Sequence, residues 1–288
     1  MSLAALTRDW YVEHARDLPW RRPGTTPWGV MVSEFMLQQT PVARVEPVWA
    51  RWMAAWPTPS ALAAASRADV LRAWGKLGYP RRALRLHAAA EAIAGRYGDV
   101  VPPDVEALEA LPGVGSYTAR AVAAFGYGLR CPVVDTNVRR VVARAVHGAG
   151  DAAPARVRAD LADVDALLPP DDATAAVVSA GLMEIGALVC TARTPRCALC
   201  PLHGECAWVT NGKPAYTGPR PPAQAYAGTD RQVRGRLLDV LRAAETPVER
   251  AALDAVWDDP AQRDRCLLTL LDDGLAEQTS DGLFTLPA

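Results

Sequence analysis

The sequence predicts a mostly helical protein, and three observations support that fold class. Apolar residues recur at spacings of three and four, as in Val70, Leu71 and Trp74, which is the period of a helix with one buried face. Alternating strand patterns are scarce before residue 210. Proline and glycine pairs, for example at 78–80 and 112–115, interrupt the chain at short intervals. We therefore expect short helices joined by tight turns.

Composition and charge set limits on the class of protein. The 288 residues suffice for two domains, and half of them are hydrophobic, as in ordinary globular proteins. No stretch approaches the roughly 20 apolar residues of a membrane helix, and the N-terminus lacks a signal-peptide pattern. Residues 1–150 hold 18 Lys/Arg against 12 Asp/Glu, whereas residues 151–288 hold 13 against 20. This asymmetry weakly favours a nucleic-acid partner, and we expect a cytoplasmic monomer without a membrane partner.

A change of composition separates a small C-terminal module from the rest. Residues 211–229 carry four prolines and three glycines, which predicts a linker. Residues 230–288 then predict three helices and a hairpin at Asp281-Gly282, an arrangement that resembles a winged helix. We expect Thr246 to cap its second helix, with Pro247 at the first helical position, and Asp259 to cap the third.

Four cysteines lie within 17 residues, in a C-x6-C-x2-C-x5-C pattern. Cysteine thiolates are the usual ligands of iron–sulfur clusters. A structural zinc site is the main alternative, and two disulfides are a third that a reducing compartment disfavours. The four residues are Cys190, Cys197, Cys200 and Cys206.

Two further motifs carry polar chemistry. In "LPGVG" (111–115), Gly113 and Gly115 allow a tight turn, which leaves backbone N–H groups at a helix start near Ser116 free to bind an anion such as a DNA phosphate. About twenty residues later, Asp135 follows three apolar or proline residues and precedes a predicted helix. The simplest role for Asp135 is a helix cap, and a catalytic role is compatible with it.

A single carboxylate, Glu34, lies in the apolar stretch "WGVMVSEFMLQQT" (28–40). Ionised acids are seldom buried without a partner, and an apolar environment raises the pKa of a glutamate. An acid in this position can carry a proton at neutral pH, which a general acid requires.

Taken together, these motifs resemble the helix-hairpin-helix DNA glycosylases. The cysteine spacing resembles the [4Fe-4S] loop of their endonuclease III and adenine glycosylase branches, and "SEFMLQQT" resembles the adenine glycosylase signature. The resemblance implies that Glu34 is the catalytic acid, Asp135 the catalytic aspartate and the four cysteines the ligands of a [4Fe-4S] cluster. The bifunctional lyases carry a lysine where this chain has Tyr117, so the resemblance implies a monofunctional glycosylase in which Tyr117 orients the acids.

The same resemblance implies a set of residues that bind DNA or the base. Tyr79 matches a residue that wedges beside the opposite, oxidised guanine, and Arg81, Arg82 and Arg85 supply nearby positive charge. Arg193 and Arg196 of the cysteine loop are expected to face phosphates. The full set of matching positions is Arg16, Leu18, Trp20, Arg21, Leu37, Gln39, Thr40, Leu77, Tyr79, Gly113, Gly115 and Asn137.

The implied architecture is an all-α, two-lobed glycosylase core. We expect a six-helix domain at 23–131, a cluster domain formed by 1–22 and 132–210, the linker at 211–229 and the winged-helix-like module at 230–288. Two features of the sequence, one residue and one module, depart from the family pattern. Ala180 stands where many members carry a polar adenine contact, and the C-terminal module replaces the usual domain that resembles a nucleoside-diphosphate hydrolase and reads 8-oxoguanine.

The implied function is base excision repair on double-stranded DNA, by removal of adenine mispaired with 8-oxoguanine or guanine, at the nucleoid of a bacterial cytoplasm. Two alternatives remain. One is a thymine or uracil mismatch glycosylase of the same superfamily, which can also carry tyrosine at position 117. The other is a non-catalytic iron–sulfur protein that binds DNA through its winged helix.

Overall fold

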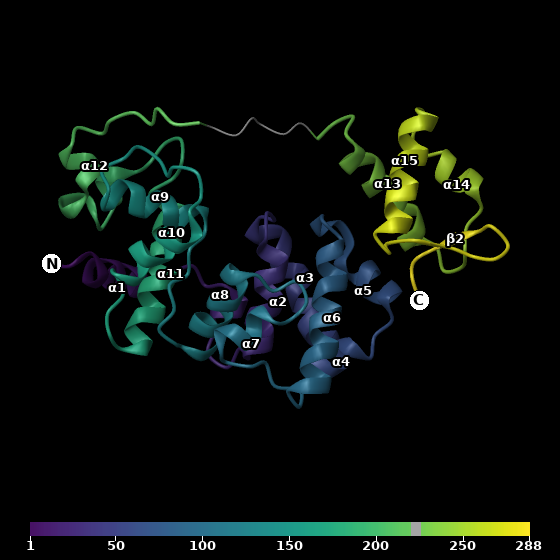
Figure 1. The fold of residues 1–288 in the computed structure, drawn as a ribbon, viewed down its shortest axis with the longest axis horizontal. Coiled ribbons are helices and arrows are strands. Elements are labelled where there is room, and N and C mark those ends of the chain that lie inside the picture. The colour runs from purple at the N-terminus through teal and green to yellow at the C-terminus, as the bar shows by residue number, and fades with distance from the viewer. Residues whose placement is uncertain (220–225) are drawn as a thin grey trace. The chain divides into compact units, whose positions relative to one another are not determined.

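A computed structural model describes residues 1–219 and 226–288 and confirms the mostly helical fold class (Figure 1). The part of the expected linker at 220–225 lies outside the described residues. The chain packs into two compact units. Unit 1 comprises residues 1–31, 103–110 and 114–221, and unit 2 comprises residues 32–102, 111–113 and 222–288. Among the described helices, none has both the length and the apolar character needed to cross a membrane.

The bounds of the elements are given in chain order. Before the linker the structure has α1 (Leu3–His14), η1 (Pro19–Arg21), α2 (Pro27–Leu37), α3 (Val42–Ala55), α4 (Pro59–Ala63), α5 (Arg67–Trp74), η2 (Gly75–Leu77), α6 (Arg81–Arg96), α7 (Val105–Glu109), α8 (Ser116–Tyr127), α9 (Thr136–Ala145), α10 (Val157–Asp165), α11 (Asp172–Leu188), η3 (Cys197–Leu199), η4 (His203–Glu205) and α12 (Ala207–Thr210). After it come α13 (Asp230–Ala243), α14 (Arg250–Asp254), α15 (Pro260–Asp272), β1 (Glu277–Gln278) and β2 (Phe284–Thr285).

Unit 1 is built around α11, a helix that is apolar on most of its surface and packs against both α1 and α9. Two glycines on α11 allow these close approaches. A Cβ at Gly181 would lie 2.6 Å from Cγ2 of Thr7 on α1, and a Cβ at Gly186 would lie 2.7 Å from Cβ of Asn137 on α9. The N-terminal residues therefore join the same unit as the cysteine loop, in spite of their distance in sequence.

The helical core of unit 2 forms around large side chains from α3, α4, α5 and α6. Trp52 and Trp74 are fully buried and meet edge to face, with ring centroids 5.5 Å apart. Leu62 and Leu86 complete the contact between α4 and α6. Because aromatic pairs and fully buried leucines dominate core energetics, these residues make a rigid support for the loops at either end of the helices.

The C-terminal module contains the three expected helices and the antiparallel hairpin, in which Gln278 pairs with Phe284. Asp259 caps α15 as expected, since its carboxylate accepts from the Gln262 N–H at 3.1 Å. The expected cap at Thr246 is wrong, because α14 begins at Arg250 after the cap residue Glu249. Backbone hydrogen bonds between Val248 and Phe284 place this segment beside β2, so it is extended where a helix start was expected.

The division into units does not follow the expected domain boundaries. The helix after the hairpin, α8, belongs to unit 1 with the cysteine loop, and the C-terminal module belongs to unit 2 with the core helices. The reason for the second grouping is direct packing of α13 on α5, with Arg242 donating to the Leu71 carbonyl at 3.0 Å. The domain boundaries given above stay a prediction.

Candidate active site and cysteine loop

Glu34 lies on α2, a helix that is buried on every side from residue 28 to residue 36. Its neighbours Met31 and Phe35 are almost completely buried, and Glu34 itself is only 6% exposed. The helix begins where Thr26 accepts a hydrogen bond from the Gly29 N–H at 3.2 Å. The sequence predicts an acid among apolar side chains, and the structure places Glu34 in such surroundings.

A buried arginine, Arg82, fixes the end of α2. Its guanidinium donates to the carbonyls of Phe35 (2.8 Å), Met36 (3.1 Å) and Gln38 (2.6 Å), and also to that of Gly78 (2.9 Å). These acceptors include the last carbonyls of a helix, which lack intrahelical partners and carry partial negative charge. Burial lowers the pKa of Arg82 to about 10, so the group stays protonated at neutral pH.

Arg82 supplies the positive charge expected near Tyr79, because its guanidinium carbon lies 5.5 Å from the centre of that ring, but the group is buried. Arg82 is only 6% exposed, and its partners are protein carbonyls and the Thr40 hydroxyl. The sequence could not predict this structural role, because the partners of Arg82 are main-chain carbonyls, which every residue type carries. Arg81 and Arg85 are exposed, as expected.

The two loops that Arg82 joins each present a residue in the left-handed backbone region. Gln39 has φ 56° and Tyr79 has φ 48°, which is uncommon for residues other than glycine and costs about 1 kcal/mol or more. Tyr79 is 37% exposed and Gln39 is also exposed. Such strain persists where surrounding contacts impose it, and here the hydrogen bonds of Arg82 do so.

The remaining expected DNA-contact residues of these loops are less accessible. Leu77 and Thr40 are buried, and the Thr40 hydroxyl donates to the Leu77 carbonyl at 3.0 Å. Leu37 is half-buried. Direct DNA contact by these three side chains stays a prediction, and burial favours a supporting role for Leu77 and Thr40.

In unit 1, Asp135 caps α9, because its carboxylate accepts from the Val138 N–H at 2.7 Å. The Asn137 amide donates to its other oxygen at 2.8 Å. Burial raises the pKa of Asp135, while these hydrogen bonds and the nearby Arg140 guanidinium act in the opposite direction. The hydrogen bonds from Val138 and Asn137 therefore favour the ionised form that a catalytic anion requires.

A chain of hydrogen bonds connects this aspartate with the cysteine loop. Arg140 donates to the Asn137 side-chain oxygen at 2.8 Å, to the Gly186 carbonyl at 2.7 Å and to the Cys190 carbonyl at 2.7 Å. Arg140 is only 8% exposed, and its partners are protein oxygens, so it faces neither DNA phosphates nor solvent. Its neighbour Arg139 pairs with Asp160 at 2.9 Å. Both arginines are engaged within the protein.

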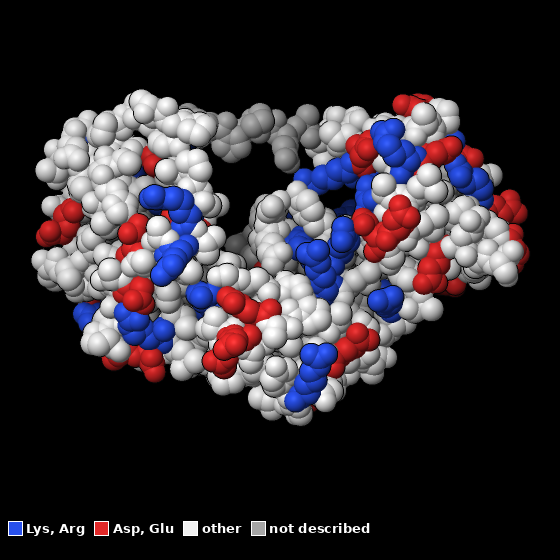
Figure 2. Space-filling view, in the orientation of Figure 1, with Lys and Arg blue, Asp and Glu red and all other residues white. Residues whose placement is uncertain are grey.

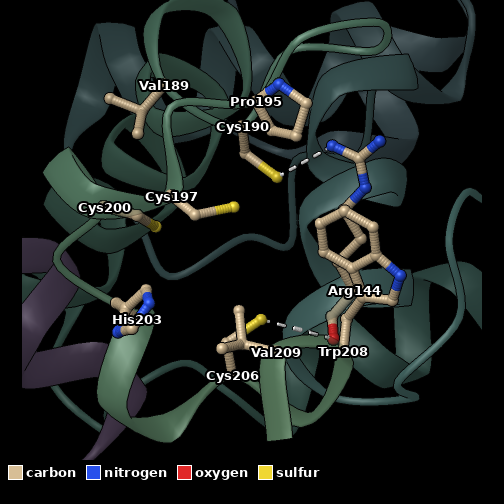
Figure 3. Close-up of a pocket in the computed structure, with 10 residues that line it drawn as sticks. All are labelled: Arg144, Val189, Cys190, Pro195, Cys197, Cys200, His203, Cys206, Trp208 and Val209. Carbon is tan, nitrogen blue, oxygen red and sulfur yellow. Dashed lines mark hydrogen bonds between the residues drawn. The ribbon is translucent and has the colours of Figure 1, made fainter. Parts of the chain in front are cut away.

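The four cysteine side chains of the loop point into one cavity (Figure 3). Apolar groups including Val189, Pro195 and Trp208 line its wall, and His203 also lies there. The cysteines are free thiols. Among the described residues, no three Cys, His, Asp or Glu side chains lie close enough together to hold one metal ion.

Arg144 supplies positive charge to this cavity. It is 3% exposed, donates to Sγ of Cys190 at 3.4 Å and stacks on the Trp208 ring, with its guanidinium carbon 4.8 Å from the ring centroid. Burial raises the pKa of the Cys190 thiol, which Arg144 partly offsets, and raises that of Cys200 to about 11. Thiolates in this loop therefore need a further positive centre, such as bound iron or zinc.

The glycine turn before α8 is also present. Gly113 has φ +75°, and a Cβ there would lie 2.6 Å from Cβ of Arg85, so this position requires glycine. Gly115, by contrast, is the N-cap of α8 with φ −99° and open space around it. The helix begins at Ser116 as expected, which leaves Tyr117 half-buried in its first turn.

The N-terminal segment is held by a buried glutamate, Glu184, whose partners lie far from it in the sequence. Glu184 of α11 is fully buried and accepts two side-chain hydrogen bonds from Arg16, at 2.6 and 2.8 Å, and one from Arg21 at 3.0 Å. Burial raises the pKa of Glu184, but the hydrogen bonds and charges of the two arginines outweigh that effect and lower it to about 2.

The neighbouring Leu18, Trp20 and Ala180 are all buried. The base-binding roles expected for Arg16, Leu18, Trp20 and Arg21 stay predictions.

Comparisons with known proteins agree with this fold and these motifs. Residues 32–164 match the model of the HhH-GPD superfamily of base excision DNA repair proteins. The chain is 66% identical to the adenine DNA glycosylase of Mycolicibacterium smegmatis, over 96% of this chain and 93% of the relative. It is 39% identical to the human adenine DNA glycosylase, over 68% of this chain and 37% of the relative.

Solved structures show the same fold. A thermostable thymine-DNA glycosylase aligns with a TM-score of 0.64 at 23% identity, over 72% of this chain and 95% of that structure. A non-covalent complex of endonuclease III with DNA aligns with a TM-score of 0.61 at 22% identity, over 73% of this chain and 94% of that structure. The chain therefore belongs to the helix-hairpin-helix superfamily of base excision DNA repair proteins and, within it, to the family of the adenine DNA glycosylases.

Proposed function

We propose that the chain is a monofunctional glycosylase that hydrolyses the N-glycosidic bond of adenine mispaired with 8-oxoguanine or guanine in double-stranded DNA. The observation that carries the proposal is a pair of protected carboxyl groups, Glu34 and Asp135, in a chain that is 66% identical to a curated adenine DNA glycosylase. One acid lies in apolar surroundings and the other is held by hydrogen-bond donors, which suits different protonation states.

The two groups divide the reaction between them. The extruded adenine accepts a proton at N7 from Glu34, the C1′–N9 bond breaks, and its electron pair stays with the base. The Asp135 carboxylate stabilises the positive charge that develops on the sugar. Water then adds at C1′ and its proton returns to the Glu34 carboxylate. We assign to Tyr117 the task of orienting the catalytic acids, and its phenol cannot form the imine of a lyase.

For the cysteine loop we propose a [4Fe-4S] cluster. Four sulfur donors line one cavity, yet within the described part of the chain they do not converge on a point suited to a single ion, which favours a larger cluster over zinc. When bound, the cluster supplies the positive centre that the buried thiolates need. Cys190, Cys197, Cys200 and Cys206 hold it, and the exposed Arg193 and Arg196 contact phosphates.

The proposal includes the DNA partner and the site of action. Tyr79 inserts beside the base opposite the adenine, and the exposed Gln39 contacts that strand. Gly113, Gly115 and the first N–H groups of α8 bind a phosphate. We expect a monomer acting at the nucleoid of the bacterial cytoplasm.

A base-release assay tests the function. Duplexes holding A:8-oxoG, A:G, T:G and U:G are incubated with the wild type, and abasic sites are cleaved by alkali. We expect release from the two adenine duplexes and strand cleavage only after alkali. Release of thymine or uracil alone, or nicking without alkali, would contradict the proposal.

A variant with a matched fold completes this test. Glu34→Gln keeps the size and hydrogen-bonding capacity of the side chain but removes the acidic proton, so we expect adenine release to fall by about 10²- to 10⁴-fold. Circular dichroism and thermal unfolding show whether the variant folds. A folded variant with wild-type activity excludes Glu34 as the acid and favours a protein that binds DNA without catalysis.

A further inference from the structure

Unit 2 contains a groove that the proposed chemistry does not use. It lies between the C-terminal module and the turn that precedes α6, and its volume is about 1000 Å³. Nine of its lining side chains are lysine or arginine, and one, Asp239, is acidic. Basic side chains gather on the helices of unit 2 and on the module in Figure 2. Such a charge balance suits a polyanion.

Several of these cations are already engaged. Arg81 and Arg234 share Asp273, at 3.1 and 2.6 Å. Lys76 and Arg242 lie 3.8 and 3.4 Å from Asp239. The Arg81–Asp273 and Lys76–Asp239 pairs join the core helices to the module. Because four cations share two carboxylates, this part of the groove keeps a net positive charge.

The remaining groove arginines have no carboxylate partner among the described residues. Arg44, Arg85 and Arg231 are all exposed, and they come from α3, α6 and α13. Like charges placed together without counter-ions are unfavourable in the free protein, and a bound anion relieves that repulsion. Arg44 donates to the Lys76 carbonyl. The groove therefore presents, from both the core and the module, exposed arginines whose charge no carboxylate of the described residues neutralises.

Arg231 also contacts the expected wedge residue. Its guanidinium carbon lies 4.3 Å from the centre of the Tyr79 ring and 5.7 Å from that of Tyr226. One of its terminal nitrogens lies 3.6 Å from the position of a Cβ built on Gly78. A guanidinium that stacks on an aromatic face keeps its N–H edge free for a phosphate oxygen.

We propose that this groove binds the sugar–phosphate backbone of the DNA, and that Arg231 contacts a phosphate while it holds Tyr79 in place. The C-terminal module is then part of the DNA interface. The inference rests on the proposed function, which supplies the DNA partner and the role of Tyr79. Arginines around a tyrosine and the amide side chains of Gln38 and Gln39 suit a nucleic-acid strand, which offers both phosphates and stacking bases.

The test measures DNA binding by the full chain, with Glu34→Gln in every protein so that no base is released. Fluorescence anisotropy follows a duplex with one A:G pair at several salt concentrations. We expect Arg231→Ala to weaken binding roughly threefold to tenfold and to reduce the salt slope by about 0.9, the loss of one phosphate contact. Arg231→Lys is expected to retain the slope, because it keeps the charge.

Arg265→Ala is the matched control. This arginine is exposed on the same module, pairs with Asp230 and does not line the groove. Its removal makes the same change in net charge as Arg231→Ala. Because Arg265 lies outside the groove, we expect the variant to keep the wild-type affinity and salt slope. Thermal unfolding of each variant shows that the module remains folded.

Two results separate failure of this inference from failure of the proposed function. Unchanged affinity and salt slope in Arg231→Ala and Arg85→Ala would overturn the inference, and that result is also expected if the groove binds an acidic peptide. If Arg231 is required for binding while wild-type protein releases no adenine, the proposed function fails and the DNA groove stands.

Discussion

In both units a charged side chain at the end of a helix holds a loop to which we assign a function. The two side chains carry opposite charges. In unit 1 the Asp135 carboxylate lies at the N-terminus of α9, where it meets free N–H groups. In unit 2 the Arg82 guanidinium lies at the C-terminus of α2, where it meets free carbonyls. Both arrangements follow the helix dipole.

The difference between the two lies in what else the charged group does. Asp135 is half-buried and is proposed to take a direct part in the reaction. Its capping hydrogen bonds lower its pKa and so favour the ionised form. Arg82 is buried and its hydrogen-bond partners are protein atoms, so its role is to hold the end of α2 and the turn before α6 in place. A charged side chain at a helix end can thus take part in a reaction or only stabilise the fold. Its degree of burial and the identity of its partners distinguish the two roles.

The largest expected effect comes from Asp135→Asn. An asparagine caps a helix about as well as an aspartate, and it removes the cost of a buried charge, so stability should be unchanged or slightly higher. Adenine release should fall by about 10³-fold, because the anion opposite the sugar is lost. Single-turnover base release and urea unfolding measure the two effects. A folded variant that releases adenine at the wild-type rate would mean that Asp135 acts only as a helix cap.

The second prediction concerns Arg82→Met, which keeps much of the side-chain volume and removes the donors. Several buried carbonyls then lose their partner, and we expect the free energy of unfolding to drop by about 3–4 kcal/mol. Urea unfolding measures the change. Arg81→Met, an exposed neighbour that pairs with Asp273, provides the comparison and should cost less than 1 kcal/mol.

The third prediction uses the buried ion pairs of Glu184. Because its folded-state pKa is about 2 against an ordinary value of 4.5, its contribution to stability is complete above pH 4.5 and is lost as the pH falls towards 2. The contribution amounts to up to about 3 kcal/mol. Urea unfolding of wild type and Glu184→Gln between pH 7 and 2 measures it. The two curves should converge at low pH, and a constant gap would contradict the assignment.

The smallest effect concerns the two glycines of the hairpin turn. Gly113→Ala should lower the free energy of unfolding by about 2 kcal/mol, because it strains a positive φ and brings a Cβ against Arg85. Gly115→Ser should change stability by less than about 0.5 kcal/mol, since serine is a good N-cap. Thermal unfolding of both variants tests whether only the first position is structurally restricted.

The sequence was informative where the chemistry depends on residue type. Four cysteines at short spacing, an acid within an apolar helix and a glycine turn before a helix are all visible without coordinates, and so are the caps of α15 and α9. The family resemblance then connected Glu34 with Asp135, which no local pattern does.

The remainder depended on contacts between distant segments. Arg82 and Arg140 are charged residues in helices, and nothing local separates them from exposed arginines such as Arg85. Their partners are main-chain carbonyls that only the tertiary fold brings within reach. Likewise, the sequence at Thr246 and Pro247 favours a helix start, but the backbone pairing of Val248 with Phe284 outweighs that local preference.

Gln39 and Tyr79 both hold left-handed backbone conformations in the folded chain. The energetic cost of these conformations is therefore part of the free energy of folding, and under the role proposed for Tyr79 the loop is preorganised for contact with DNA. An enzyme that must inspect very many normal base pairs for each damaged one benefits from such a preorganised probe.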